Sequence, residues 1–145
     1  MKRILFIVII VGLAVAAFFA FREYNRTNKD LKNTTPDITT DVTGILAAFD
    51  KDSASFNKKY TDKVIAVSGV VKSIDQQGNP VVIALGNAGE MSSVQCSMDS
   101  TYARDYQSVK EGVQVTIKGL CTGARADEMF GTDVILNRCI LAQFK

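Results

Sequence analysis

An uncharged, apolar run from Ile4 to Phe21 constrains this 145-residue chain more than any other feature of its sequence. At about 1.5 Å per residue, these eighteen residues would form a helix of about 27 Å, close to the hydrocarbon thickness of a bilayer. We therefore interpret residues 1–21 as an N-terminal transmembrane helix that anchors the chain. The rest of the chain is long enough for one domain but not for two.

A cleaved signal peptide is the alternative interpretation of the same run. Lys2 and Arg3 precede it, and Ala14-Val15-Ala16 has the small residues of a cleavage site. We favour the retained helix because the apolar run continues to Arg22, beyond the point at which a signal core usually ends. Basic residues stand on both sides of the run, so their count does not set its orientation. The short basic start is typical of export signals and favours a domain on the extracytoplasmic side.

The segment that follows, residues 22–40, is rich in Asn, Thr, Asp and Lys and contains Pro36. It has almost no large apolar side chains and cannot bury a core, so we predict a flexible polar tether. The domain is then residues 41–145. It carries 11 Lys and Arg against 12 Asp and Glu, a net charge of −1, so it lacks the basic excess typical of nucleic-acid binders.

Two short helices are predicted at the start of this domain. Apolar residues recur at helical spacing between Val42 and Phe49, and Thr40 or Asp41 can cap the first turn. A second helical stretch begins at Ser53. After these helices the apolar period changes from about 3.6 to 2, which indicates strands.

Five strands are predicted, and the first has a glycine, Gly69, at its centre, where a bulge or a bend is expected. The strands are Lys63–Ile74, Val81–Leu85, Ser92–Met98, Val113–Leu120 and Asp133–Phe144, with a short helical or irregular connection at Ser100–Lys110 and a polar loop at Cys121–Gly131. Five strands with a helical insert after the third predict a mainly β fold, the five-stranded OB-fold or Greek-key barrel, preceded by short α-helices. A bent first strand can pair on both sides of such a barrel. A partly open sandwich or an α+β layer would fit the same pattern.

The chain contains no histidine. This excludes Ser-His-Asp and Cys-His catalysis and every His-ligated metal site. Asp127 and Glu128 are the only adjacent acidic pair, and we expect them in a solvated loop. The glycines do not form a phosphate-binding loop. We therefore predict a protein that is not an enzyme and that binds no metal and no cofactor.

Four segments resemble the tRNA_anti-like OB-fold domain family of bacterial envelope proteins. They are Tyr60–Ile74, Ser93–Cys96, Gly112–Gly123 and Val134–Cys139. The resemblance covers residues 41–140 and implies an OB-fold and a place in the bacterial periplasm or cell envelope. The family's label refers to the anticodon-binding OB domain of aminoacyl-tRNA synthetases, which is a kinship of fold.

Nucleic-acid binding is the function that an OB-fold first suggests, and it needs a basic groove with aromatic side chains on which bases stack. No aromatic residue lies between Lys63 and Met98, and Lys72 is the only basic residue inside that range. We therefore do not expect nucleic acid as a partner. The function predicted is a membrane-tethered interaction module for an unidentified protein or small ligand, with nucleic-acid or oligosaccharide recognition through the barrel face as the alternative. In an OB-fold the ligand surface lies on the second and third strands and nearby loops, where the candidates are Gln76, Gln77, Asn79, Gln95, Arg125 and Phe130.

Three cysteines, Cys96, Cys121 and Cys139, stand at inward-facing strand positions. The predicted fourth and fifth strands are neighbours in the barrel, so we predict a Cys121–Cys139 disulfide. A bridge between Cys96 and Cys139 is the alternative and needs a close parallel register. An exported protein meets the oxidants that form such a bond.

Overall fold

The computed structural model describes residues 12, 15, 18, 31–129 and 131–142. The predicted membrane segment, apart from residues 12, 15 and 18, lies outside these residues, and so does the first part of the predicted tether. Among the described residues, no helix combines the length and the apolar character needed to cross a bilayer. In chain order the elements are β1 (Ile38–Asp41), α2 (Val42–Lys51), α3 (Ser53–Tyr60), β2 (Val64–Asp75), β3 (Val82–Leu85), β4 (Ser93–Met98), the 3-10 turn η1 (Ser100–Tyr102), α4 (Ala103–Tyr106), β5 (Gln114–Asp127) and β6 (Gly131–Leu141).

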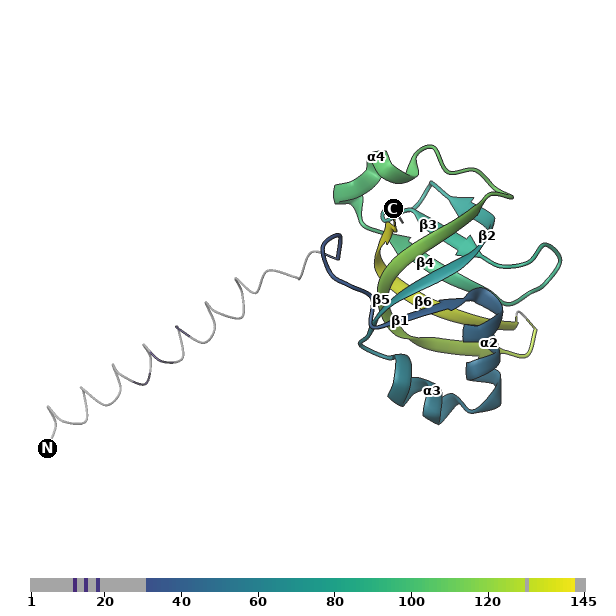
Figure 1. Ribbon diagram of the computed structural model, residues 1–145, viewed down its shortest axis with the longest axis horizontal. Coiled ribbons are helices and arrows are strands. Elements are labelled where there is room, and N and C mark those ends of the chain that lie inside the picture. The colour runs from purple at the N-terminus through teal and green to yellow at the C-terminus, as the bar shows by residue number, and fades with distance from the viewer. Residues whose placement is uncertain (1–11, 13–14, 16–17, 19–30, 130, 143–145) are drawn as a thin grey trace, which may run out of the picture.

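Strands β2 to β6 form a closed barrel (Figure 1). The strand order is β2-β3-β4-β6-β5, and a second pairing between β2 and β5 closes it. The β4–β6 pair is parallel, whereas the other neighbours within the barrel are antiparallel. With η1 and α4 inserted between β4 and β5, this is the OB-fold arrangement, and the open-sandwich and α+β alternatives are wrong. Closure leaves few free strand edges.

One long strand, β2, pairs on both sides of the barrel, as predicted. Its first part, Val64–Val70, pairs with β5, and from Val71 onward it pairs with β3. Gly69 stands just before this change of partner, and the register shift itself falls two residues later. A Cβ atom at Gly69 would overlap Cγ2 of Val42, so the glycine also lets α2 lie close against the strand.

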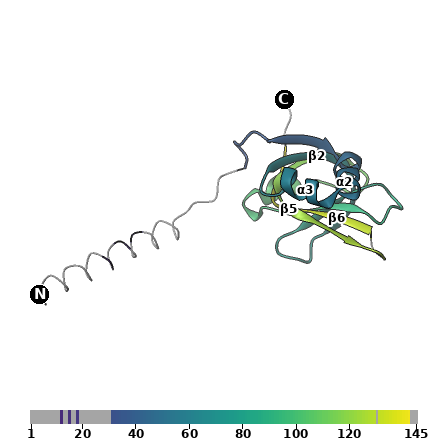
Figure 2. The same ribbon diagram turned by 90° about the horizontal axis from the view of Figure 1, so that it is seen from below.

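Helices α2 and α3 lie next to each other beside one end of the barrel (Figure 2). The predicted helical face of α2 is confirmed, because Val42, Ile45 and Leu46 are buried. Asp41 caps α2 by accepting a hydrogen bond from the Gly44 amide at 2.9 Å. Phe56 of α3 is almost fully buried. The helices therefore close the core at this end with apolar side chains.

The loop predicted at Cys121–Gly131 is mostly strand. β5 continues to Asp127 and pairs with β6 along its whole second half, so only residues 128–130 connect the two strands. Gly123 takes a φ of 133° where the register shifts, a conformation that favours glycine. Backbone pairing requires no apolar side chain. A strand in this polar segment therefore shows no pattern of apolar residues by which it could be predicted.

Residues 31–40 also differ from the prediction, because they pack on the barrel instead of forming a free tether. Leu31 is 5% exposed, and β1 pairs in parallel with β2. We call residues 31–36 the N-terminal strap. Its position depends on tertiary contacts with β5, and no local sequence pattern predicts these contacts.

Candidate functional site

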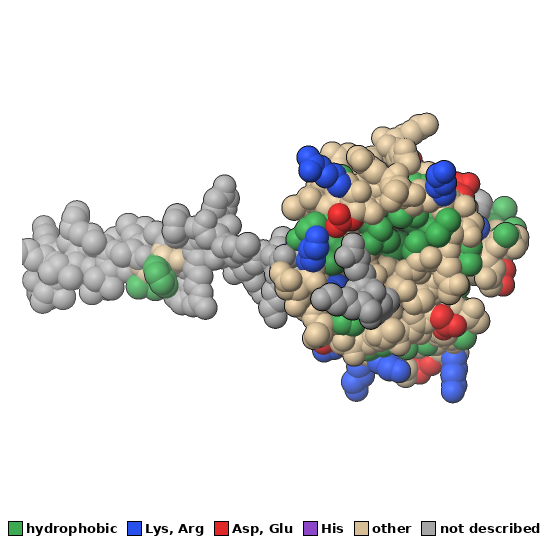
Figure 3. Space-filling model, turned by 45° about the horizontal axis from the view of Figure 1, so that its top comes forward, with side chains coloured by type: hydrophobic (Ala, Val, Ile, Leu, Met, Phe, Trp, Pro, Cys, Tyr) green, Lys and Arg blue, Asp and Glu red, His purple; other side chains and the backbone are tan. Residues whose placement is uncertain are grey.

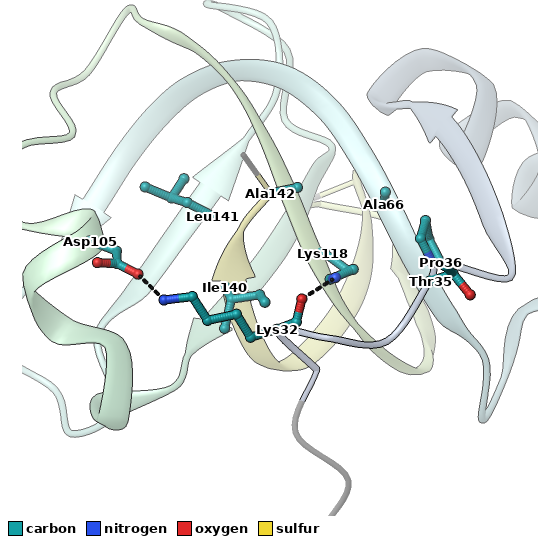
Figure 4. A pocket seen from close by; sticks show the side chains of 9 residues that line it. All are labelled: Lys32, Thr35, Pro36, Ala66, Asp105, Lys118, Ile140, Leu141 and Ala142. Atoms are coloured by element: carbon teal, nitrogen blue, oxygen red, sulfur yellow. Dashed lines mark hydrogen bonds and ion pairs between the residues drawn. The ribbon is translucent and has the colours of Figure 1, made fainter. Parts of the chain in front are cut away.

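A pocket of about 380 Å³ opens where the N-terminal strap meets the barrel (Figure 4). Its apolar side comes from Ala66 of β2 and from Ile140 and Leu141 of β6. This volume lies within the range of small-molecule sites in proteins. In Figure 3, hydrophobic side chains gather in a hollow with charged side chains around it.

The charged rim of the pocket consists of Lys32, Asp105 and Lys118. Lys32 Nζ lies 3.4 Å from Oδ2 of Asp105 and 4.7 Å from the ring centroid of Tyr102. Both partners of the ion pair are well exposed, and such pairs contribute about 0–1 kcal/mol. A ligand can therefore compete for the Lys32 ammonium at little cost.

Lys118 has a different role, because its side chain is buried. Its Nζ donates hydrogen bonds to the carbonyl oxygens of Lys32 at 3.2 Å and Thr34 at 2.7 Å. The alternating pattern of β5 predicts this side chain pointing outward, and the strap covers it there. Sequence reasoning missed Lys118, Lys32 and Asp105 as site residues, since their proximity depends on where the strap lies.

On the predicted ligand face, the structure brings together Gln95 and Arg125. Gln95 Nε2 donates to Ser93 Oγ at 2.8 Å, and Ser93 Oγ donates to Oδ1 of Asp133 at 2.7 Å. Arg125 is opposite Asp133 in the β5–β6 register and is exposed. The result is a short row of hydrogen-bonding groups across β4, β6 and β5.

The other candidate residues of the predicted ligand face lie elsewhere. Gln76, Gln77 and Asn79 are exposed in the β2–β3 loop. This loop joins the barrel where Val82 pairs with Ser97, at the opposite end of β4 from Ser93. The structure therefore does not gather the loop residues with Gln95 and Arg125. Phe130 lies outside the described residues.

The predicted Cys121–Cys139 bond is not formed, because all three cysteines are buried free thiols. The β5–β6 register places Leu136 opposite Cys121, and the thiol next to that of Cys139 belongs to Cys96. Burial raises the pKa of Cys121, and burial together with the Cys96 contact raises the pKa of Cys139 well above its ordinary value. Raised pKa values disfavour the thiolate form that nucleophilic or metal-binding cysteines need.

No group of three or more Cys, Asp or Glu side chains within the described part of the chain could hold a metal ion. Asp127 and Glu128 are exposed where β5 ends. Neither the pocket nor the β4–β6 face pairs a nucleophile with a general base among the residues described. What both surfaces offer chemically is hydrogen bonding, charge and apolar contact.

A closed five-stranded β-barrel with a helix inserted between β4 and β5 is an OB-fold. The tRNA_anti-like family profile matches residues 1–140, and the chain belongs to this family. No curated protein matches the chain.

We compare it with two of the solved structures that resemble it. One is a protein from Klebsiella pneumoniae subsp. pneumoniae, described as a candidate nucleic acid-binding lipoprotein. It has 16% sequence identity and a TM-score of 0.55, with 72% of this chain and 91% of that chain covered. The other is the OBody NL8 bound to hen egg-white lysozyme, with 14% identity, a TM-score of 0.40, and 57% and 97% covered. At these identities the first likeness shows the shared fold alone.

Proposed function

We propose that this protein is a non-catalytic, membrane-tethered binding module whose OB-fold domain lies on the extracytoplasmic side, and that the pocket beside the N-terminal strap holds its ligand. The observation that carries the proposal is the composition of this pocket. Apolar side chains from β2 and β6 stand beside the exposed Lys32–Asp105 pair. Few convergent polar groups above an apolar surface are typical of binding sites.

The pocket favours an amphipathic occupant with an apolar part and an anionic or hydrogen-bond-accepting group. Ile140 and Leu141 offer apolar contact. The Lys32 ammonium is the exposed cation on the rim, whereas Lys118 is already bonded to the strap. An acidic group that replaces Asp105 as the partner of Lys32 would gain a charge-assisted hydrogen bond. A small ligand or an exposed protein side chain could supply these groups.

The location rests on other observations. The run from Ile4 to Phe21 has the length and character of a membrane helix. The Klebsiella protein of similar fold is described as a lipoprotein, a class attached to membranes. The strap begins at Leu31, close after the run, so a bound ligand would lie near the bilayer surface.

Nucleic-acid recognition is the alternative, and the description of the Klebsiella protein is the observation that favours it. Strands β3 and β4 carry no aromatic side chain, and the domain's net charge is −1. Both features oppose single-strand binding, which uses base stacking and counterion release. We expect single-stranded DNA and RNA to bind more weakly than about 10 μM near physiological salt, in the range of non-specific contacts. Sub-micromolar affinity with a steep salt dependence would make nucleic-acid recognition the favoured function and the pocket-binding module the alternative.

Site-specific photocrosslinking in membranes of the native host tests the binding site. A photoreactive amino acid replaces Thr35 at the pocket or, as a matched exposed control, Gln76 in the β2–β3 loop. We expect adducts from position 35 that disappear when Ala142→Trp fills the pocket. Adducts from position 76 alone would show that the ligand binds at the β2–β3 loop. The absence of adducts from both positions would contradict the binding function.

The location has its own test. Full-length protein should remain with membranes after carbonate extraction, because burial of the Ile4–Phe21 run is effectively irreversible. Protease added outside cells with a permeabilised envelope should remove the domain. A soluble mature form that begins near Ala17 would instead identify a cleaved signal peptide. Protection of the domain until the cells are lysed would show that it lies on the cytoplasmic side.

A further inference from the structure

The N-terminal strap and the barrel form two walls of the pocket. Lys32, Thr35 and Pro36 line it from the strap, and β2 and β6 line it from the barrel. Figure 4 shows two bonds that hold the strap in this position, from the Lys32 ammonium to Asp105 and from the Lys118 ammonium to the Lys32 carbonyl oxygen. The pocket therefore has both walls only while the strap lies on the barrel.

The C-terminal end of the strap is fixed by the backbone. The Asp37 amide donates to the Val64 carbonyl oxygen at 2.7 Å, and the Val64 amide donates to Oδ2 of Asp37 at 2.9 Å. From Ile38 onward the chain is β1, which pairs with β2 over its whole length. Strands paired in a sheet are among the last parts of a domain to open. The chain from Asp37 onward therefore stays in place when the strap moves.

The N-terminal end of the strap is held mainly by side chains. Leu31 is buried, and the Lys32 ammonium reaches Asp105. The Lys118 ammonium donates to the carbonyl oxygens of Lys32 and Thr34. Within the strap, the Thr34 amide donates to the Leu31 carbonyl oxygen at 3.3 Å, so this end forms one turn that can leave as a unit. When it leaves, water solvates the Lys118 ammonium, so opening leaves no buried charge without a partner.

We infer that the N-terminal strap is a movable wall of the pocket, which opens at Leu31, pivots at Pro36 and closes on an occupant that contacts both walls. This inference rests on the proposed function of the pocket and adds its regulation. An occupant that bridges the strap and the barrel binds the closed form only, and it therefore shifts the strap toward that form. Conversely, a change that reduces the closed population weakens binding in proportion.

The strap also connects the pocket with the N-terminal part of the chain. In chain order it lies between the Ile4–Phe21 run and the barrel. A partner or a force that acts on the N-terminal segment therefore reaches the pocket through the strap. In the other direction, occupation of the pocket determines whether the strap is free to move.

Alkylation of a thiol at position 31 tests this coupling. Leu31→Cys is introduced into the full-length protein in phosphatidylcholine nanodiscs and treated with N-ethylmaleimide, and mass spectrometry assigns the label to its position. The native cysteines are buried. The thiol at position 31 is covered while the strap is closed, so its alkylation rate follows the open population. Gln76→Cys, in the exposed β2–β3 loop, is the matched control.

The probe is 4-phenylbutyrate, which combines an apolar ring with a carboxylate. Its dissociation constant is measured on the same variants from the methyl resonances of Ile140 and Leu141, and Ala142→Trp should abolish these shifts. At a probe concentration of about ten times this constant, alkylation at position 31 should slow about tenfold, because a ligand of the closed form alone scales protection by 1 + [L]/Kd. Alkylation at position 76 should not change.

Two outcomes separate the inference from the proposed function. Binding of 4-phenylbutyrate without slower alkylation at position 31 would overturn the movable wall and keep the binding pocket. No binding of the probe would refute the proposed class of ligand, and the coupling with it.

A second variant tests the opening without any probe. Lys118→Met should speed alkylation at position 31 by about fivefold or more, because the closed strap loses its hydrogen-bond donor. Alkylation at position 76 should again stay the same. An unchanged rate at position 31 would show that the strap does not open at the end that Lys118 holds, and it would overturn the inference.

Discussion

The ammonium of Lys118 on β5 donates a hydrogen bond to the carbonyl oxygen of Thr34 at 2.7 Å, although 84 positions separate the two residues. A buried ammonium is costly unless its donors are satisfied, and the strap carbonyls satisfy them. In return, Lys118 holds the strap on the barrel and so builds one wall of the pocket. The pocket and the attachment of the strap thus depend on the same side chain.

Lys118→Met should therefore destabilise the domain. Methionine keeps an apolar chain of similar length but leaves the Lys32 and Thr34 carbonyls without their donor, which should cost about 1–3 kcal/mol. Urea denaturation gives the free energy of unfolding. Asp105→Asn is the matched control, since it weakens only the exposed Lys32–Asp105 pair and should change stability by less than about 1 kcal/mol. Equal effects would show that Lys118 does not fasten the strap.

Removal of the strap, together with Asp37 and Ile38, should also be costly. A fragment of residues 39–145 lacks the buried side chain of Leu31 and both strap carbonyls that Lys118 uses. Compared with a fragment of residues 31–145, we expect a loss of about 2 kcal/mol or more, mainly from Leu31 burial. The two fragments are compared by their urea midpoints, with equal slopes of the free energy of unfolding against urea concentration. Identical midpoints would restore the interpretation of residues 31–38 as part of a free tether.

Gly69 and Val42 should behave as a coupled pair. Gly69→Ala places a methyl group on Cγ2 of Val42, and overpacking of this kind costs about 1–3 kcal/mol. In a Val42→Ala background the same substitution should cost less, because the clashing methyl group is gone. A double-mutant cycle should give an interaction energy of about 0.5 kcal/mol or more. Additive effects would mean that Gly69 serves the bend of β2 and not the approach of α2.

The cap of α3 predicts a dependence of stability on pH. The side-chain hydrogen bond from Ser55, aided by backbone amides, lowers the pKa of Asp52 below its ordinary value. A lowered folded-state pKa means that the ionised carboxylate stabilises the fold fully above the ordinary aspartate pKa, roughly pH 4. The contribution is lost as pH falls through the lowered folded-state value.

Asp52→Asn isolates this charge, since asparagine is also a good N-cap residue. The difference in urea midpoint between wild type and Asp52→Asn should be constant near neutral pH and should shrink in acid. Ser55→Ala should reduce the same pH-dependent difference by removing the hydroxyl donor. A difference that does not vary with pH would show that the Ser55–Asp52 bond does not shift the titration.

Much of the barrel could be predicted from local patterns. The spacing of Val42, Ile45 and Leu46 predicts α2, and the Val-rich run around Gly69 predicts β2 with partners on both sides; both predictions are confirmed. These patterns work because burial of one face forces apolar residues to recur with the period of the element. The helical insert between the third and fourth barrel strands is also found as expected.

The sequence alone determined the candidate membrane run, the absence of histidine chemistry and the periodic core elements, because each of these follows from residue type and local spacing. Only the tertiary structure decided the parts that depend on distant partners. The second half of β5 is a strand because β6 pairs with it, and Lys118 is buried because the strap covers it. Backbone hydrogen bonds and long-range contacts leave no periodic pattern in the sequence. For this reason, residues predicted as loop, exposed surface and tether belong in the structure to a barrel strand, a buried contact and a pocket wall.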